Sequence, residues 1–235
     1  MDLKEKTWKT ILERPELFSA HLQYAPKADA SGNFQIMGLL HRGKKLNNQW
    51  HMMDVPTKHP GTGYYVVDND GGNFREFPSG RPFVRSNNGH CAWVGNTGRI
   101  VFSVSWDQKT WQLDPRWPQG NLFTAAAGEE KPRVFHAPAH RFNHVSVSKC
   151  GRYFVCDSYP KGIPGPTVIV IGNIETGKYR NVISDCKASS GGPACSHAHA
   201  YLTADNKHVI YNADPYWIGQ VFFARLADGF LESLN

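Results

Sequence analysis

A short pattern recurs four times along the chain and begins each time with a histidine. The four histidines are His21, His90, His144 and His199. Each histidine opens a short strand-like segment, which is followed by a turn and then by a run rich in β-branched and aromatic residues. Two strand patterns joined by a tight turn predict a β-hairpin. The chain is therefore expected to contain four hairpins whose histidines occupy the same register.

Further strand patterns lie outside the four hairpins, at residues 63–68, 167–171 and 220–224. The histidine pattern recurs every ~55–70 residues, which leaves room for about four strands in each repeat. Four-stranded repeats are typical of β-propeller blades. A β-sandwich is the alternative, but it gives no reason for one residue type to recur at the same offset before each turn. The sequence therefore predicts an all-β protein with the β-propeller fold.

We expect one domain over residues 1–235 with about four blades. The blades are expected over residues 1–62, 63–116, 117–172 and 173–235, with an offset where strands are shared. Residues 7–12 resemble the outer strand of a preceding blade. Because four blades are few for a closed ring, three arrangements stay open: a fragment of a larger ring, a small ring that closes on itself, and a ring completed by self-association or by a partner chain.

Composition is consistent with a turn-rich β protein, since the 235 residues include 22 glycines and 15 prolines and only 20% are charged. There is no apolar run of about 18 residues that could span a membrane, and no apolar segment follows the first residues as in a signal peptide. The five cysteines form no regular framework, so reduced thiols in the cytoplasm are expected. A Cys186–Cys195 crosslink is the alternative.

The formal net charge is +6, which raises the question of an anionic partner. The basic residues are scattered, apart from the cluster at residues 42–45, and no nucleic-acid-binding motif accompanies them. A solvated basic surface is therefore favoured over a nucleic-acid interface, and no membrane partner is expected. An anionic small substrate remains compatible with this charge.

The four histidines are expected to converge, because the first strand of each propeller blade lines the central channel. A lone buried histidine is usually a hydrogen-bonded core residue. Four at matched positions instead favour a functional site, and neutral imidazole is a good ligand for a divalent metal ion. His197 lies two residues before His199, so both side chains point to the same face of a strand. Among the other histidines, only His41, next to the basic cluster, has a suggestive position.

The segment 195–214 resembles the C-terminal His-Pro-His blade of the oligogalacturonate lyases, with Ala198 in place of the proline. The similarity extends to residues 89–93, 144–148 and 69–73, and more loosely to His21. Members of that family are seven-bladed propellers that degrade short pectin fragments. The resemblance implies a β-elimination enzyme that uses a divalent metal ion, with Mn²⁺ as the first candidate.

By the same resemblance, His144, His197 and His199 match the metal ligands, and His90 matches the proposed catalytic base. The acidic oligosaccharide is expected to meet basic and imidazole groups at the channel. These candidate substrate-binding residues are His21, His41, Arg42 and Lys45.

Two family residues are replaced in this chain. Ala194 stands where the family has a glutamine ligand, and Gly63 stands where it has a catalytic arginine. A metal-dependent lyase is therefore the leading hypothesis. The alternatives are a non-catalytic propeller that binds an acidic sugar, and a propeller scaffold for protein interactions.

Overall fold

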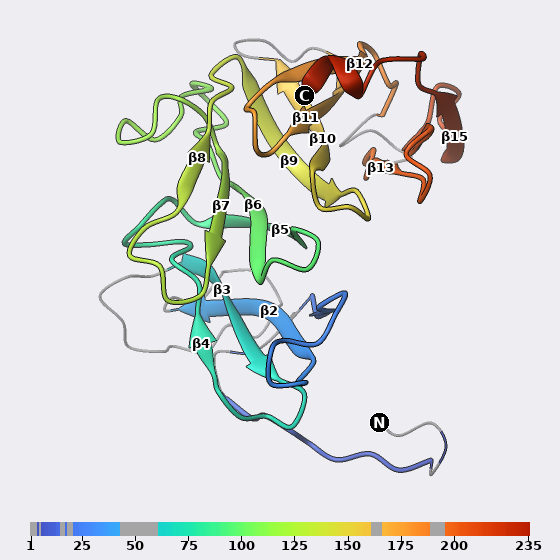
Figure 1. The fold of residues 1–235 in the computed structure, drawn as a ribbon. Helices are drawn as coiled ribbons and strands as arrows, with labels where there is room; N and C mark the ends of the chain where they lie inside the picture. The colour runs from blue at the N-terminus through green and yellow to red at the C-terminus, as the bar shows by residue number, and fades with distance from the viewer. Residues whose placement is uncertain are drawn as a thin grey trace.

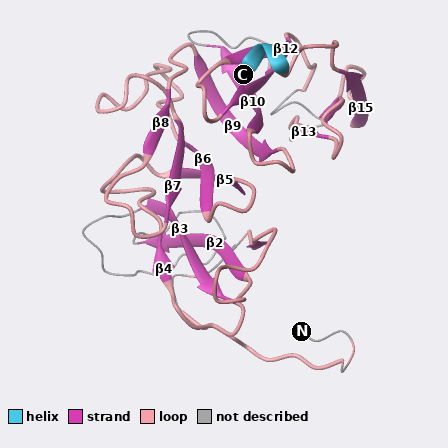
Figure 2. Cartoon of the chain, in the orientation of Figure 1, coloured by secondary structure: helices cyan, strands magenta, loops and turns pink. Residues whose placement is uncertain are grey.

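The computed structural model describes residues 4, 6–14, 17, 21–42, 61–160, 166–188 and 196–235. Within these ranges the regular elements are fifteen β-strands and one turn of 3₁₀ helix, η1 (Glu232–Leu234) (Figures 1 and 2). None of the described helical segments is long and apolar enough to span a bilayer. The predicted all-β fold class is confirmed.

The strands form four antiparallel sheets, and each sheet is a meander in which every strand pairs with the next one in sequence. This is the architecture of β-propeller blades. The first sheet consists of β1 (Gln23–Tyr24), β2 (Gln35–Arg42), β3 (Gly61–Asp68) and β4 (Arg75–Glu76). The second consists of β5 (Asn87–Trp93), β6 (Arg99–Val104), β7 (Leu122–Ala126) and β8 (Arg133–Phe135). The third consists of β9 (His140–Val147), β10 (Tyr153–Pro160), β11 (Val168–Asn173) and β12 (Tyr179–Ile183), and the fourth of β13 (Tyr201–Leu202), β14 (His208–Ala213) and β15 (Gln220–Arg225).

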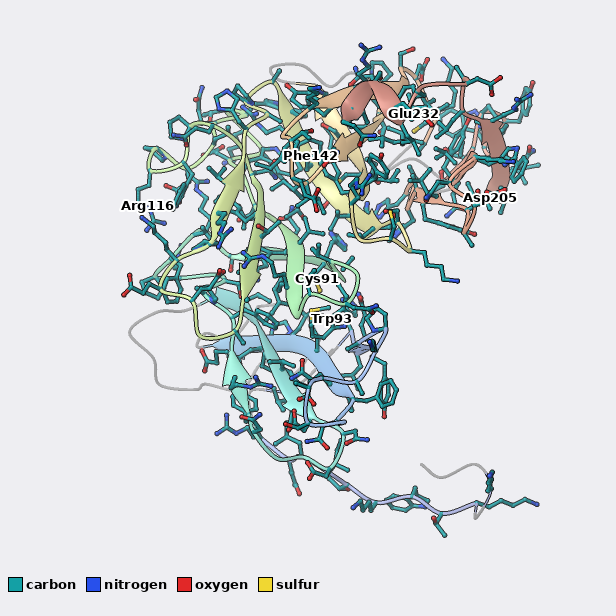
Figure 3. All side chains as sticks on the ribbon, viewed as in Figure 1. Cys91, Trp93, Arg116, Phe142, Asp205 and Glu232 are labelled. Atoms are coloured by element: carbon teal, nitrogen blue, oxygen red, sulfur yellow. The ribbon has the colours of Figure 1, made fainter. Side chains whose placement is uncertain are left out.

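Apolar side chains fill the space between each pair of neighbouring sheets. Between the first and second sheets, Cys91 and Trp93 of β5, both labelled in Figure 3, belong to a core shared with β2 and β3. Cys91 Sγ lies 3.6 Å from Met37 Sδ. Phe142 and Phe154 belong to the core between the second and third sheets. A third core joins the third and fourth sheets and includes Leu234 of η1. The sheets are thus stacked face to face, as blades are.

The first strand of each sheet lies on the inner side of the stack, where β5 packs beside β9 and β9 beside β13. Side chains link these inner strands to the next sheet through main-chain carbonyls. Gln23 Nε2 donates to the Cys91 carbonyl at 2.8 Å, and Ser146 Oγ donates to the Ala200 carbonyl at 2.7 Å. Ser103 Oγ of β6 donates to the Asn143 carbonyl at 2.6 Å. These bonds fix the relative height of the inner strands.

The two ends of the stack differ. At the first sheet, Ile11, Leu12 and Leu17 cover the apolar face of β2 and β3, and the Arg14 guanidinium lies 4.0 Å above the Phe74 ring. The expectation of a strand at residues 7–12 is wrong, because only Thr7 forms an isolated bridge there. The segment packs through its side chains instead of its backbone.

At the fourth sheet, the face turned away from the third sheet is apolar and exposed. Val221 and Phe223, which alternate along β15, are 71% and 63% exposed. The first and fourth sheets lie apart at the two ends of an arc (Figure 1). Completion of the ring by self-association or by another chain stays a prediction.

The described cysteines all have free thiols. Cys91, Cys156 and Cys186 are free and buried, and Cys150 is free and exposed. Burial raises the pKa of the Cys91 thiol to about 12 and that of Cys186 to about 11, so both are inert thiols at neutral pH. Cys195, the other half of the alternative crosslink, lies outside the described residues.

The contribution of packing between sheets is testable at Phe154, which is fully buried in the second core. Phe154→Ala is expected to lower the free energy of unfolding by about 3–5 kcal/mol, because it leaves a cavity between two sheets. Phe223→Ala, on the exposed face, is expected to change it by less than about 0.5 kcal/mol. Urea denaturation measures both, and similar losses in the two variants would contradict packing between sheets as the source of stability.

Candidate metal centre

The pairing of the inner strands is interrupted at His90 and at His144. In β5 the register with β6 shifts between Asn87 and Cys91, which flank His90. In β9 the register with β10 shifts where His144 faces Asp157. Such bulges turn a side chain away from the regular alternation of a strand. Both histidines are therefore aimed by irregularities in the sheet and not by strand alternation alone.

The other two repeat histidines lie immediately ahead of their inner strands in an uncommon backbone conformation. His21 has φ +42° and His199 has φ +41°, both in the left-handed region that few non-glycine residues adopt. Conformations of this kind cost free energy and cluster at functional sites. All four repeat histidines thus share an interrupted backbone, which sequence periodicity alone does not reveal.

Three histidines meet at the inner edge of the third and fourth sheets. His144, His197 and His199 each place one ring nitrogen within 4.8 Å of the others. His197 Nδ1 lies 3.2 Å from His144 Nε2, and the His144 and His199 ring centroids are 3.9 Å apart. His144 is buried, His197 half-buried and His199 exposed, so the cluster opens to the surface on one side.

A buried carboxylate holds His144 in place from behind. Asp157 Oδ2 lies 2.7 Å from His144 Nδ1, and Asp157 Oδ1 accepts the His144 main-chain N–H at 2.7 Å. Donation of the Nδ1 proton to this carboxylate leaves the Nε2 lone pair facing His197 and His199. A metal-binding histidine is commonly oriented by a carboxylate on its second nitrogen in this way.

The donor set fits a divalent metal ion. Two imidazole nitrogens on one ion, each at about 2.1 Å, lie about 3 Å apart, which is close to the 3.2 Å separation seen here between His197 and His144. Three imidazoles leave further coordination positions for water or substrate, as catalytic sites do. Imidazole is shared by Mn²⁺, Zn²⁺ and other first-row ions, so the ligands alone do not select the metal.

His90 lies against this cluster from the second sheet. Its ring centroid is 4.0 Å from that of His144 and 6.2 Å from that of His199. Burial, and next the neighbouring His144, lower the pKa of His90 to about 3. Its Nδ1 atom is buried without a hydrogen-bond partner among the described residues. His90 therefore offers an uncharged imidazole at neutral pH.

His199 is shifted in the same direction. Partial desolvation of its ring is the largest cause of its lowered pKa; the neighbouring His144 and His197 add to the shift, and Asp157 opposes it. The uncharged form is the one that binds a metal ion.

The predicted substrate-binding residues are distributed unevenly. His21 is exposed, and its Nδ1 lies 3.2 Å from the Gly89 carbonyl, next to His90 but outside the three-histidine cluster. His41 is half-buried near the end of β2, opposite Thr62. Arg42 ends β2, but its side chain and all of Lys45 lie outside the described residues.

Two hollows open beside the cluster and share His197. One, of about 420 Å³, lies against the fourth sheet and is lined by His197, His199 and Asn212 among others. The other, of about 500 Å³, lies between the second and third sheets and contains Trp106, Trp111 and Tyr159. Volumes in this range suit small-molecule ligands.

Sequence reasoning missed several residues that the structure brings to this place. Asp157 could have been found as the acidic residue on the strand that pairs with that of His144. The aromatic residues Trp106 and Trp111 lie in a loop without periodicity, so no pattern marked them. Of the two family positions replaced in this chain, Gly63 pairs with Leu40 in the first sheet, and Ala194 lies outside the described residues.

The sequence matches no protein-family model, and a search of the curated proteins finds no match. Solved structures with a similar fold include an oligogalacturonate lyase from Vibrio parahaemolyticus, with 13% identity and a TM-score of 0.48 over 97% of this chain and 72% of that protein. TolB from Acinetobacter baumannii has 12% identity and a TM-score of 0.46, over 89% and 55% of the two chains. A puromycin-hydrolysing peptidase from Mycobacterium tuberculosis has 14% identity and a TM-score of 0.48, over 95% and 33%.

The role of the carboxylate behind His144 is testable by replacing it. Asp157→Asn is expected to weaken Mn²⁺ binding about 10- to 100-fold, because the amide no longer fixes the tautomer and orientation of His144. Calorimetric titration of the purified protein measures the affinity. Asp228→Asn, which changes an exposed carboxylate, serves as the control and is expected to bind like the parent protein. Unchanged affinity in Asp157→Asn would contradict this role.

Proposed function

We propose that this protein is a metal-dependent lyase that performs β-elimination on a short uronic-acid oligosaccharide. The observation that carries the proposal is the cluster of His144, His197 and His199, braced by Asp157, with the uncharged His90 ring against it. The resemblance of the histidine-containing segments to oligogalacturonate lyases supports the substrate class. His144, His197 and His199 are the proposed ligands, and His90 is the proposed base.

The chemistry of a uronic acid explains why a metal ion and a base belong together. Elimination removes the C5 proton next to an ionised carboxylate, which would otherwise build up two negative charges. A divalent ion, Mn²⁺ in this proposal, supplies a Lewis acid that neutralises the carboxylate and stabilises the developing charge when it is bound. The three imidazoles would bind this ion, and Asp157 would orient the His144 ring.

In this proposal, His90 takes the C5 proton. Its low pKa keeps the imidazole lone pair available at neutral pH, although it also makes the group a weak base. The electrons of the C5–H bond form the C4=C5 double bond, the C4–O bond breaks, and the leaving oxygen takes a proton from water. His90 then returns its proton to solvent, which closes the cycle.

The residues around the centre suit the approach of an acidic sugar. His21 is exposed, and its Nδ1 lies 3.2 Å from the carbonyl of Gly89, the residue before His90, so its ring is proposed to donate a hydrogen bond to a sugar oxygen. Contacts of His41, Arg42 and Lys45 with substrate stay predictions.

A second candidate function is binding of an acidic sugar without turnover. The observation that favours it is Gly63, which stands in a paired strand of the first sheet where the related lyases have a catalytic arginine. Loss of a preorganised cation removes a large part of the stabilisation of developing charge. Metal and sugar would then bind at the same cluster, but no product would form.

Ultraviolet absorbance of the unsaturated product distinguishes the two functions. The protein with Mn²⁺ is expected to produce this absorbance from di- or trigalacturonate, and His90→Ala is expected to lower kcat by at least about 100-fold while Mn²⁺ stays bound. His136→Ala, which alters an exposed histidine, is the matched control and is expected to retain activity. Loss of metal in His90→Ala would make His90 a ligand, and absence of product from any uronate would favour the binding protein.

A further inference from the structure

The hollow between the second and third sheets has the composition of a ligand site that the histidine cluster does not explain. Three aromatic side chains form much of its wall, and we call it the aromatic cleft. Its volume is about 500 Å³. It is lined by Asn88, Ser105, Trp106, Gln108, Trp111, Asn143, Tyr159 and His197. Because His197 also belongs to the three-histidine cluster, a ligand in the cleft lies next to the proposed metal centre.

The three aromatic rings lie close to one another in the lining of the cleft. The Trp106 and Trp111 centroids are 6.3 Å apart with an interplanar angle of 30°. Tyr159 of β10 lies 6.0 Å from Trp106 and 6.4 Å from Trp111, at steeper angles. All three side chains are only half-buried, so ring surface remains available to a ligand.

A buried arginine fixes the backbone of Trp111. The Arg141 side chain is fully enclosed, and both its Nε and Nη2 donate to the Trp111 carbonyl, at 2.9 and 2.6 Å. Its Nη1 donates to the carbonyls of Pro138 and His140. Trp111 itself has φ +59°, an uncommon conformation for a bulky residue. The buried Arg141 guanidinium thus holds Trp111 in a strained backbone conformation. Strain of this kind is often found where a loop has a functional role.

The polar part of the lining is neutral and hydrogen-bonding. Amide and hydroxyl side chains come from Asn88, Ser105, Gln108 and Asn143, and none of the described lining residues is an acid, a lysine or an arginine. The Trp106 Nε1–H is buried with no acceptor among the described residues. A buried donor without a partner is costly, and a ligand hydroxyl in the cleft would supply one.

We infer that the aromatic cleft is a subsite for a pyranose ring of the substrate, one sugar removed from the residue held at the histidine cluster. An aromatic face packs against the C–H face of a pyranose, while amides and hydroxyls bind its ring hydroxyls. The lining packs against the C–H face and the hydroxyls of this sugar, and the carboxylate of the neighbouring sugar reaches the proposed metal centre. This inference rests on the proposed substrate class, and it adds a specificity determinant to it.

The test compares ligands of different length in a protein that does not turn them over. In the His90→Ala protein with excess Mn²⁺, calorimetry measures the affinities of galacturonate, which reaches only the histidine cluster, and of trigalacturonate, which also reaches the cleft. When Trp106→Ala is introduced into the His90→Ala protein, it is expected to weaken trigalacturonate binding about tenfold and to leave galacturonate binding unchanged within about twofold. Trp106→Phe, which keeps a ring, is expected to restore most of the lost affinity.

Trp8→Ala removes an exposed tryptophan far along the chain from the cleft and is the matched control, with affinities like those of the parent protein. Trigalacturonate affinity that is unchanged in Trp106→Ala would overturn the cleft, and so would an equal loss for both ligands. Trp106→Ala could weaken trigalacturonate binding equally with and without Mn²⁺, while the parent protein forms no product. That result would overturn the proposed lyase but keep the cleft as a sugar-binding site. Failure of every galacturonate to bind would overturn both.

Discussion

Face-to-face packing of the sheets is the constraint on which the site depends. Each core between two sheets is made by side chains from both, so no sheet can move without exposing the core of its neighbour. Side-chain hydrogen bonds from Gln23, Ser103 and Ser146 to main-chain carbonyls of the next sheet then set the height of the inner strands. Histidines from separate sheets can converge only because this height is fixed.

Irregular backbone occurs at each of the four repeat histidines. Bulges occur at His90 and His144, and left-handed φ values at His21 and His199, whereas β10 and β11 pair in unbroken register over six residues. Two of the three register shifts among the described strands lie at His90 and His144, and the third lies between β11 and β12. Such irregular backbone lowers the stability of the fold, and it changes the direction in which the histidine side chain points.

The sequence was sufficient to predict the strands and hairpins, because these follow from the alternation of residue types along the chain. Alternation and turns predicted the hairpins and the strands at 63–68, 167–171 and 220–224, which correspond to β3, β11 and β15. Periodicity failed at residues 7–12, where apolar side chains cover a sheet without joining it. It was also silent on Asp157 and on the aromatic cleft, because a bulge and an irregular loop bring those side chains into place.

The charges at the histidine cluster connect the proposed metal to the proposed substrate. Among the described residues that contact the cluster, Asp157 is the one carboxylate, and it is buried directly behind His144. The negative charge of this carboxylate would repel the carboxylate of an acidic sugar. A divalent ion brings two positive charges against one negative charge, which leaves one positive charge to attract a carboxylate. A divalent ion at this cluster, as proposed above, would therefore make it attractive to an anionic ligand.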